Sequence, residues 1–237
     1  MDTTLLKALN EERRNRRAAL VITDLGSGAQ RLVREAGIGA EPDAGELRQM
    51  LLSGKSRTQA TEAGERFIAV HLPATKFVII GAVHISQVLA PMAMATGFDV
   101  TVIDPRTAFA TPERFAGINL LAEWPDEVLG DVGLDRWCAF AALTHDPKID
   151  DMPLAAALKA GCFYVGALGS RKTHAKRLDR LMQAGIGPGL AARIHAPIGL
   201  DIGAQSPAEI AVSVLAEAIA ALRERDARRD TAGGAAA

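Results

Sequence analysis

Residues 76–86, which read KFVIIGAVHIS, decide the fold class of this 237-residue chain. The run from Phe77 to Ile80 is continuously apolar, which is typical of a strand that helices cover on both faces of a parallel sheet. Gly81 follows at once, and a helical pattern then continues to Thr96. This junction of strand, glycine turn and helix indicates the start of a βαβ unit.

The same alternation continues toward the C-terminus. Further apolar runs predict strands at 99–103, 138–143 and 163–165. Helical patterns fill the gaps, near 125–130 and at 151–160, 170–184 and 207–225. Strands that alternate with helices predict an α/β fold, with a Rossmann-like, doubly wound parallel sheet over residues 73–226. We expect residues 227–237 to form a disordered tail.

The first 72 residues predict a separate, small N-terminal α/β unit. Helices are expected at 4–17 and 43–52, and strands at 18–23 and 66–72, before a break at Pro73. A unit of this size can bury only a small hydrophobic core by itself.

Composition narrows the class of protein. Hydrophobic residues make up 49% and charged residues 23% of the chain, as in ordinary globular proteins. Since 27 Lys and Arg face 28 Asp and Glu, no basic field predicts a nucleic-acid partner. The stretch 77–98 is interrupted by His84, Ser86, Gln87 and Pro91, so we expect no membrane partner. The charged N-terminus lacks the apolar core of a signal peptide, which favours a cytoplasmic location.

Cysteine and histidine usage does not predict a metal site. Cys138 and Cys162 are too few for a disulfide framework or a CxxC motif. Cys138 lies in an apolar strand and is interpreted as core, whereas Cys162 could lie there or handle sulfur. The five histidines have no metal-binding spacing, so metal ligands stay unassigned.

The loop from Gly81 to Ser86 stands where a dinucleotide fingerprint belongs, with backbone N–H groups and a helix start facing a phosphate. Only the first glycine of GxGxxG is present, because Val83 occupies the second position. A β-branched side chain there blocks close approach and resists positive φ. The loop therefore predicts a Rossmann-like fold more strongly than NAD binding.

Two charged residues follow the next predicted strand. Asp104 comes 23 residues after Gly81, where a ribose-binding carboxylate usually lies, and Arg106 is two residues further on. Alternatively, Gly81 is a tight turn between strand and helix, and Asp104 caps the turn at Pro105.

A second junction of strand, glycine loop and helix lies at residues 164–171. Gly166 and Gly169 free the backbone to fold around an anion, and Ser170 is a good N-cap. Arg171 then opens a cationic first turn, which opposes the helix dipole unless an anion binds. A solvated basic helix start is the equally weighted alternative.

Polar residues also end the strand at 138–143. Open α/β sheets bind ligands at the carboxyl ends of their strands, which makes His145 and Asp146 ligand candidates or, alternatively, helix caps. Asp150 and Asp151 are interpreted as caps that precede the next helix.

The loop after residue 196 carries one more carboxylate. Asp201 lies among apolar and glycine residues, so we expect it to be buried and bonded to backbone amides or to a ligand. Glu209 opens the last helix, either as a favourable dipole position or as part of the predicted cleft.

Five motifs occur together and in order: FVIIGAVHISQVLAP, TVIDPR, LTHDPKIDD, FYVGALGSRKTH and RIHAPIGLDIGAQSPAEIAVSVLAE. Over about residues 76–222 they resemble the C-terminal Rossmann domain of the XdhC/CoxI family, the xanthine dehydrogenase accessory factors. The resemblance implies a non-enzymatic chaperone that binds the molybdenum cofactor (molybdopterin) and supports its sulfuration by a cysteine desulfurase. It also implies transfer of the cofactor to a xanthine dehydrogenase-type molybdenum hydroxylase. For such a carrier we expect a modest, transient interface and a homodimer as a candidate working unit.

The resemblance suggests roles for particular residues. The loop Gly166–Ser170 with Arg171 would hold the cofactor's phosphate, and Asp201 and His145 would hydrogen-bond its pterin. No catalytic residue is assigned. The full set of candidate cofactor-binding residues is Gly81, His84, Asp104, Arg106, His145, Asp146, Gly166, Gly169, Ser170, Arg171, Asp201 and Glu209.

The chain departs from the family pattern in two places. The family's first glycine loop usually reads GAGH, whereas Val83 stands at its third position here. Residues 1–72 lack the family's GGC-type cysteine, which implies a shortened, divergent N-terminal domain. The alternative functions are an NAD(P)-dependent oxidoreductase that uses Gly81, Asp104 and Arg106, and a regulatory protein that keeps the fold but binds no small molecule.

Overall fold

The computed structural model describes residues 2–62 and 64–232, with side chains described to residue 224. It divides into two compact units, Met1–Ala74 with Glu224–Ala237, and Thr75–Arg223. The break after Ala74 lies two residues beyond the boundary that the sequence predicts. Helix α8 (Pro207–Ala232) includes the first part of the expected disordered tail, and residues 233–237 lie outside the described residues.

The first unit contains an antiparallel sheet in the order β2-β1-β4-β3. Its strands are β1 (Ala19–Asp24), β2 (Gln30–Arg34), β3 (Arg57–Thr61) and β4 (Gly64–His71). Its helices are α1 (Thr3–Arg14), the 3₁₀ helix η1 (Glu35–Ala40) and α2 (Ala44–Ser53). The edge strands β2 and β3 were not predicted, because most of their side chains are exposed and polar and leave no apolar run.

The second unit contains a parallel sheet in the order β10-β9-β8-β5-β6-β7. Its strands are β5 (Lys76–Ile80), β6 (Asp99–Ile103), β7 (Asn119–Leu121), β8 (Cys138–Ala142), β9 (Tyr164–Ala167) and β10 (Ile194–His195). Counted from β5, this is the Rossmann order 3-2-1-4-5-6, which confirms the predicted fold class. The two edge strands, β7 and β10, are too short to be recognised as apolar runs.

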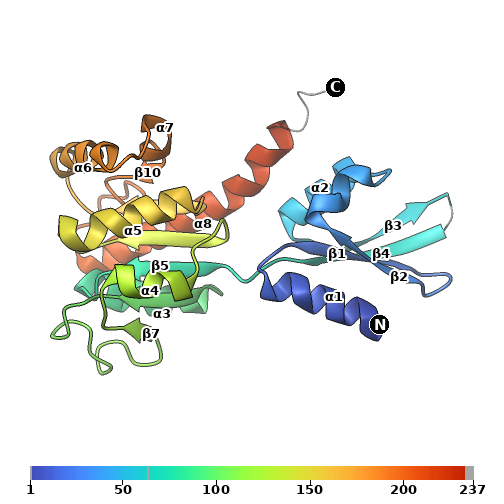
Figure 1. Ribbon diagram of the computed structural model, residues 1–237, viewed down its shortest axis with the longest axis horizontal. Coiled ribbons are helices and arrows are strands. Elements are labelled where there is room, and N and C mark those ends of the chain that lie inside the picture. Colours follow the sequence, from blue (N-terminus) through green and yellow to red (C-terminus); the bar gives the residue numbers. More distant parts are fainter. Residues whose placement is uncertain (1, 63, 233–237) are drawn as a thin grey trace. The chain divides into compact units, whose positions relative to one another are not determined.

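Helices cover both faces of this sheet (Figure 1). The helices α3 (His84–Ala95) and α8 pack on one face. The other face carries α4 (Pro125–Val132), α5 (Pro147–Lys159), α6 (Arg171–Gln183) and α7 (Pro188–Ala191). The described part of the chain contains no helix that is both long and apolar enough to cross a membrane.

Strand β5 shows why the sheet is covered on both faces. Phe77 and Ile79 point into the core under α3 and α8, whereas Val78 and Ile80 point into the core under α4 and α5. All four side chains are fully buried. Since burying such a side chain stabilises a fold by about 1.5–3 kcal/mol, this strand anchors both layers. Gly81 is therefore held at a fixed place on the carboxyl edge of the sheet.

Candidate functional site

The carboxyl edge of the sheet changes direction between β5 and β8. The chain leaves β5 toward β6 on one side and leaves β8 toward β9 on the other, while β5 and β8 pair directly. Doubly wound proteins bind ligands at such a switch point. Two glycine loops lie at this edge of the sheet, one after β5 and one after β9.

In the first loop, Gly81 is required by its backbone and by its neighbour. It has φ +111°, and a Cβ atom there would lie 2.8 Å from Cγ2 of Thr144 at the end of β8. A side chain cannot fit that approach without movement of the strand end. The turn interpretation of Gly81 is thereby supported.

Val83 does not carry the backbone strain that the sequence suggests. Its φ of −96° and ψ of 177° are ordinary for a residue that precedes a helix, so the implied need for a positive φ at this position was wrong. The buried Ser86 hydroxyl donates to the carbonyls of Gly81 (2.6 Å) and Val83 (2.8 Å), which ties the loop to α3. His84 begins α3 and is exposed.

Asp104, directly after β6, hydrogen-bonds to the first loop. Its fully buried carboxylate accepts hydrogen bonds from the amide of Ala82 (2.7 Å) and the amide of Arg106 (2.9 Å). It also accepts from Nε (2.9 Å) and Nη2 (2.7 Å) of Arg106. Burial opposes ionisation, but these bonds outweigh it and hold the pKa of Asp104 below its usual value. The Asp104 oxygens that were expected to bind a ribose are thus already hydrogen-bonded within the protein. The Ala82 amide of the loop is likewise already bonded, to Asp104.

The two glycines predicted for the second loop differ in position and in role. Gly166 lies inside β9 and is buried, and a Cβ there would lie 2.6 Å from Ile198 and from the Tyr164 hydroxyl. It serves close packing, so the idea that it frees a loop around an anion was wrong. Gly169 does lie in the loop, at φ +141°. Ser170 caps α6 as predicted, and its Oγ accepts from the amide of Thr173 (3.2 Å).

A pocket of about 390 Å³ lies beside this loop, between α5, α6 and the end of β8. Its volume is within the range of small-molecule sites, which begins near about 300 Å³. The pocket is lined by His145, Pro147, Asp150, Asp151, Lys172, Thr173, Lys176, Arg177 and Arg180. Arg171 is exposed and is not among these residues.

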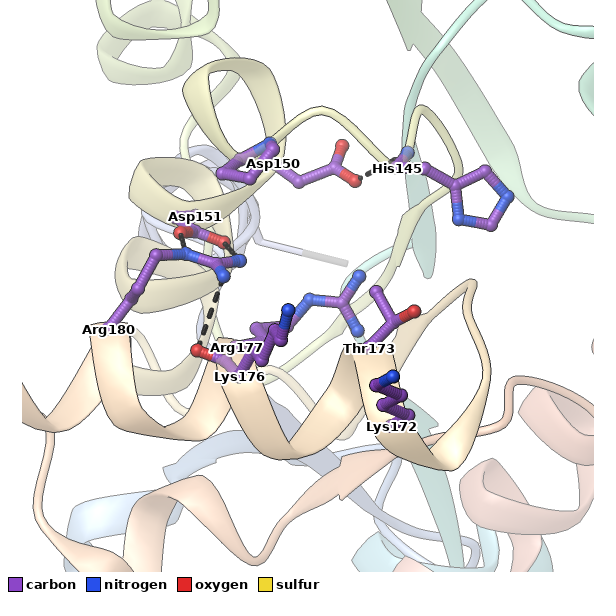
Figure 2. A pocket seen from close by; sticks show the side chains of 9 residues that line it. His145, Asp150, Asp151, Lys172, Thr173, Lys176, Arg177 and Arg180 are labelled. Atoms are coloured by element: carbon purple, nitrogen blue, oxygen red, sulfur yellow. Dashed lines mark hydrogen bonds and ion pairs between the residues drawn. The ribbon is translucent and has the colours of Figure 1, made fainter.

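Arg177 is the most unusual residue of the pocket. Only 2% of its surface is exposed, and its Nη2 donates to the Leu168 carbonyl (2.8 Å). Its Nε and Nη1 are buried, and no described residue is their hydrogen-bond partner. Figure 2 shows that this guanidinium points into the space between α5 and α6, toward Asp150 and His145. Burial lowers the pKa of Arg177, and Asp150 and Asp151 counteract part of that shift.

Asp150 folds back from the first turn of α5 onto the end of β8. Its carboxylate accepts from the Thr144 hydroxyl (2.7 Å) and the His145 amide (3.0 Å). Burial, which these bonds only partly offset, raises the pKa of Asp150 to about 6. Asp146 is the cap of α5, since its Oδ1 accepts from the amide of Lys148 (2.9 Å). The expectation that Asp150 precedes the helix was wrong, because Pro147 starts the helix earlier.

Ion pairing in the pocket leaves a cationic surplus. Asp151 pairs with Arg180 on the next helix. Within the described ranges, neither Lys172 nor Lys176 has an ion pair. His145 lies at the edge of the pocket with φ +65° and is exposed over much of its surface. Partial desolvation of its ring by the surrounding protein, followed by the charge of Arg177, lowers its pKa.

His145 is the one sequence candidate that lines this pocket. The two candidates nearest the C-terminus, Asp201 and Glu209, lie in and after the loop that leads into α8. Asp201 is exposed, contrary to the expectation that it is buried, because its loop lies on the surface. Glu209 is exposed and accepts from the amides of Gln205 (2.7 Å) and Ser206 (3.0 Å). It therefore caps the start of α8, as its dipole-position interpretation predicts.

The residues that sequence analysis missed share one face of α6. Lys172, Lys176 and Arg180 repeat at intervals of four, and Thr173 and Arg177 run beside them. Such spacing places side chains on one stripe of a helix. Cationic residues on a stripe, rather than at the helix start, are the signal that could have found them.

Neither cysteine is exposed. Cys138 and Cys162 are both fully buried and free, and the core interpretation of Cys138 is confirmed. Among the residues that the structure describes, no group of three or more His, Cys, Asp or Glu side chains could hold a metal ion.

Comparison with known proteins gives consistent matches to one family. The model of the XdhC Rossmann domain matches residues 77–218. The uncharacterized protein YqeB of Escherichia coli (strain K12) is 34% identical over 160 residues, which cover 64% of this chain and 28% of that protein. A probable subunit of the xanthine dehydrogenase of Bacillus subtilis (strain 168) is 33% identical over 148 residues, which cover 62% of this chain and 43% of that protein.

A third relative is the molybdenum cofactor insertion chaperone PaoD of Escherichia coli (strain K12), 32% identical over 145 residues, or 61% of this chain and 39% of that protein. The matched region thus spans less than half the length of each of these curated relatives. The crystal structure of a xanthine dehydrogenase from Bacillus halodurans superimposes with a TM-score of 0.64 at 22% identity, and the match covers 93% of this chain and 64% of that one.

That structural likeness supports the fold alone. The family match is more informative, because residues 77–218 make up more than half of the chain and include both glycine loops and the pocket between α5 and α6. The resemblance seen in the five motifs is confirmed: the chain belongs to the XdhC Rossmann domain family.

Proposed function

We propose that this protein is a cytoplasmic accessory factor that binds the molybdenum cofactor and delivers it to a xanthine dehydrogenase-type molybdenum hydroxylase. The names of two relatives support this role, since one is a molybdenum cofactor insertion chaperone and the other a probable xanthine dehydrogenase subunit. In this proposal the chain is a carrier and not a catalyst.

The observation that carries the proposal is the pair of nitrogens on the buried Arg177 that have no partner among the described residues. The cofactor has a phosphate group, and a guanidinium that lacks partners is suited to such an anion. The exposed Lys172 and Lys176 add positive charge at the same pocket. The residues present therefore fit the anionic end of the cofactor.

When bound, the cofactor would supply the redox-active molybdenum centre that the acceptor enzyme needs. The residues of this chain would hold and orient it at the carboxyl edge of the sheet. His145 lies at that edge and offers ring nitrogens to a pterin. Because both lysines are exposed, the pocket opens to solvent, which suits a carrier that must release its cargo.

Support of sulfuration is the finer part of the proposal. Sulfur transfer through a protein thiol needs an accessible thiolate. Since Cys138 and Cys162 are fully buried, we propose that a cysteine desulfurase acts on the held cofactor directly.

The strand order keeps an NAD(P)-dependent oxidoreductase as the second candidate, because this order is common to dinucleotide-binding folds. Asp104 argues against it, since its oxygens already bind Ala82 and Arg106. We expect no NADH binding at micromolar concentration.

The test is retention and transfer of the cofactor. The purified full chain is loaded anaerobically with released cofactor, separated from excess, and analysed for bound pterin as its form-A derivative. We expect retained pterin and activation of an apo hydroxylase by the loaded protein. Absence of retained pterin, together with micromolar NADH affinity by calorimetry, would favour the oxidoreductase instead.

A further inference from the structure

We propose that the pocket between α5 and α6 is a phosphate monoester site, in which Arg177 makes the buried contact and Lys172 and Lys176 make the exposed ones. This inference deepens the proposed function and rests on it only for the identity of the natural ligand. It places the phosphate contact on the inner face of α6, and not on Arg171 at the start of that helix.

The buried guanidinium of Arg177 needs a further hydrogen-bond acceptor. A guanidinium has five N–H donors and stays charged in proteins, so its burial without partners is unfavourable. The Leu168 carbonyl accepts a hydrogen bond from Nη2 at 2.8 Å. Nε and Nη1 have no acceptor within the described structure. A phosphate oxygen in the pocket would supply the missing acceptor.

The carboxylates near Arg177 are already engaged elsewhere. Asp151 pairs with Arg180, and Asp150 accepts from the Thr144 hydroxyl and the His145 amide. Neither forms an ion pair with Arg177 within the described part of the chain. The buried guanidinium therefore has no carboxylate partner of its own.

The lining of the pocket carries a net positive charge. Four cationic side chains, Lys172, Lys176, Arg177 and Arg180, line the pocket together with two carboxylates, Asp150 and Asp151, which gives a formal charge of +2 with His145 neutral. The pocket also borders the first turn of α6 through Lys172 and Thr173, where the helix dipole favours an anion. A dianionic phosphate monoester matches this surplus.

The experiment measures binding of inorganic phosphate, and separately of phenyl phosphate, to the full chain by calorimetry at low salt. In the double variant Lys172→Gln/Lys176→Gln, both affinities should fall by about tenfold or more, because two charged contacts are lost. Arg171→Gln is the matched control. It removes one cation from the adjacent position outside the pocket and should change the affinities by less than about twofold.

Arg177 needs a direct readout, because its replacement can disturb the packing around Leu168. The ¹⁵N-¹H resonance of Arg177 Nε in the unmodified protein should shift when phosphate is added, and that of Arg171 should not. Equal loss of affinity in Arg171→Gln and in the double variant would overturn the proposal, as would an Arg177 resonance that phosphate leaves unchanged.

Cofactor retention separates this inference from the proposed function. If the double variant loses phosphate affinity and the protein never retains the cofactor, the phosphate site stands and the proposed function fails. If the double variant retains the cofactor as well as the wild type does, and inorganic phosphate does not compete, the proposed function stands and the phosphate site is wrong.

Discussion

The two glycine loops of the Rossmann domain have the same local topology and opposite chemistry. Each follows a buried parallel strand and leads into a helix. In the first loop, Asp104 binds Ala82 and Arg106, so the polar groups satisfy one another. Beside the second loop, Nε and Nη1 of Arg177 have no hydrogen-bond partner in the part of the chain that the structure describes. Among the described residues, the comparison therefore favours the second loop for the anion site that we propose, because only there does a buried polar neighbour still lack partners.

The largest expected effect is a loss of stability when Asp104, which hydrogen-bonds the first glycine loop, is replaced. Replacing Asp104 with Ala leaves the Arg106 guanidinium and the Ala82 amide without their buried acceptor, which should lower the free energy of unfolding by about 3–5 kcal/mol. Urea denaturation measures this loss. Glu209→Ala is the control, because its exposed capping bonds should contribute only about 1 kcal/mol. Similar losses in both variants would show that Asp104 does not hold the first loop closed.

The second effect separates contact from strain at Gly81. Gly81→Ala should destabilise the protein by about 2–3 kcal/mol, because the new Cβ meets Thr144 and the backbone has positive φ. Gly97 has φ +93° with no atom near its Cβ position, so Gly97→Ala should cost about 1 kcal/mol from strain alone. Equal losses in the two variants, measured by urea denaturation, would contradict the contact between the first loop and β8.

The third effect concerns the open pocket and pH. The pKa of Asp150 is raised to about 6, so its carboxylate is ionised near neutral pH and repels an anion. Lowering the pH from about 7.5 to about 5.5 protonates this carboxylate, and sulfate affinity should rise by about threefold to tenfold. Sulfate is the probe because it does not titrate in this range.

Asp150→Asn isolates that contribution from the ring of His145, which also titrates at the pocket edge. The variant should bind sulfate more tightly than the wild type at about pH 7.5 and show a flatter pH dependence, with circular dichroism confirming its fold. An unchanged pH profile would mean that Asp150 does not face the bound anion.

The smallest effect is expected at Arg171. Its side chain is exposed and lies outside the pocket, so Arg171→Gln should change the free energy of unfolding by less than about 0.5 kcal/mol. Thermal and urea denaturation would measure it. A loss of several kcal/mol would show that the basic start of α6 has a structural role that the exposed position does not suggest.

The sequence predicts the Rossmann domain well because its central strands are continuous apolar runs. Phe77–Ile80 and Asp99–Ile103 appear as strands with nearly the predicted bounds. The polar edge strands β2 and β3 leave no such run and were missed. A strand is recognised in the sequence by its run of apolar residues, which reflects burial. Edge strands are only partly buried and therefore lack such a run.

The candidate site was predictable only in its location. The sequence places the site near Gly169 and Ser170, and the pocket lies beside that loop. It does not show that Arg171 stays outside the pocket while Arg177 turns inward, because that depends on how α6 packs against α5. Nor does sequence spacing show that both carboxylate oxygens of Asp104 already accept hydrogen bonds, since the donors come close only in the folded protein.

The most direct test of the central claim is to locate a bound anion at the two loops in one crystal. Crystals of the full chain soaked in selenate, a sulfate analogue with an anomalous signal, would show where the anion binds. We expect an anomalous peak within hydrogen-bonding distance of Arg177 Nε or Nη1, between α5 and α6. A peak at the amides of the Gly81–Ser86 loop, with none at Arg177, would contradict the claim.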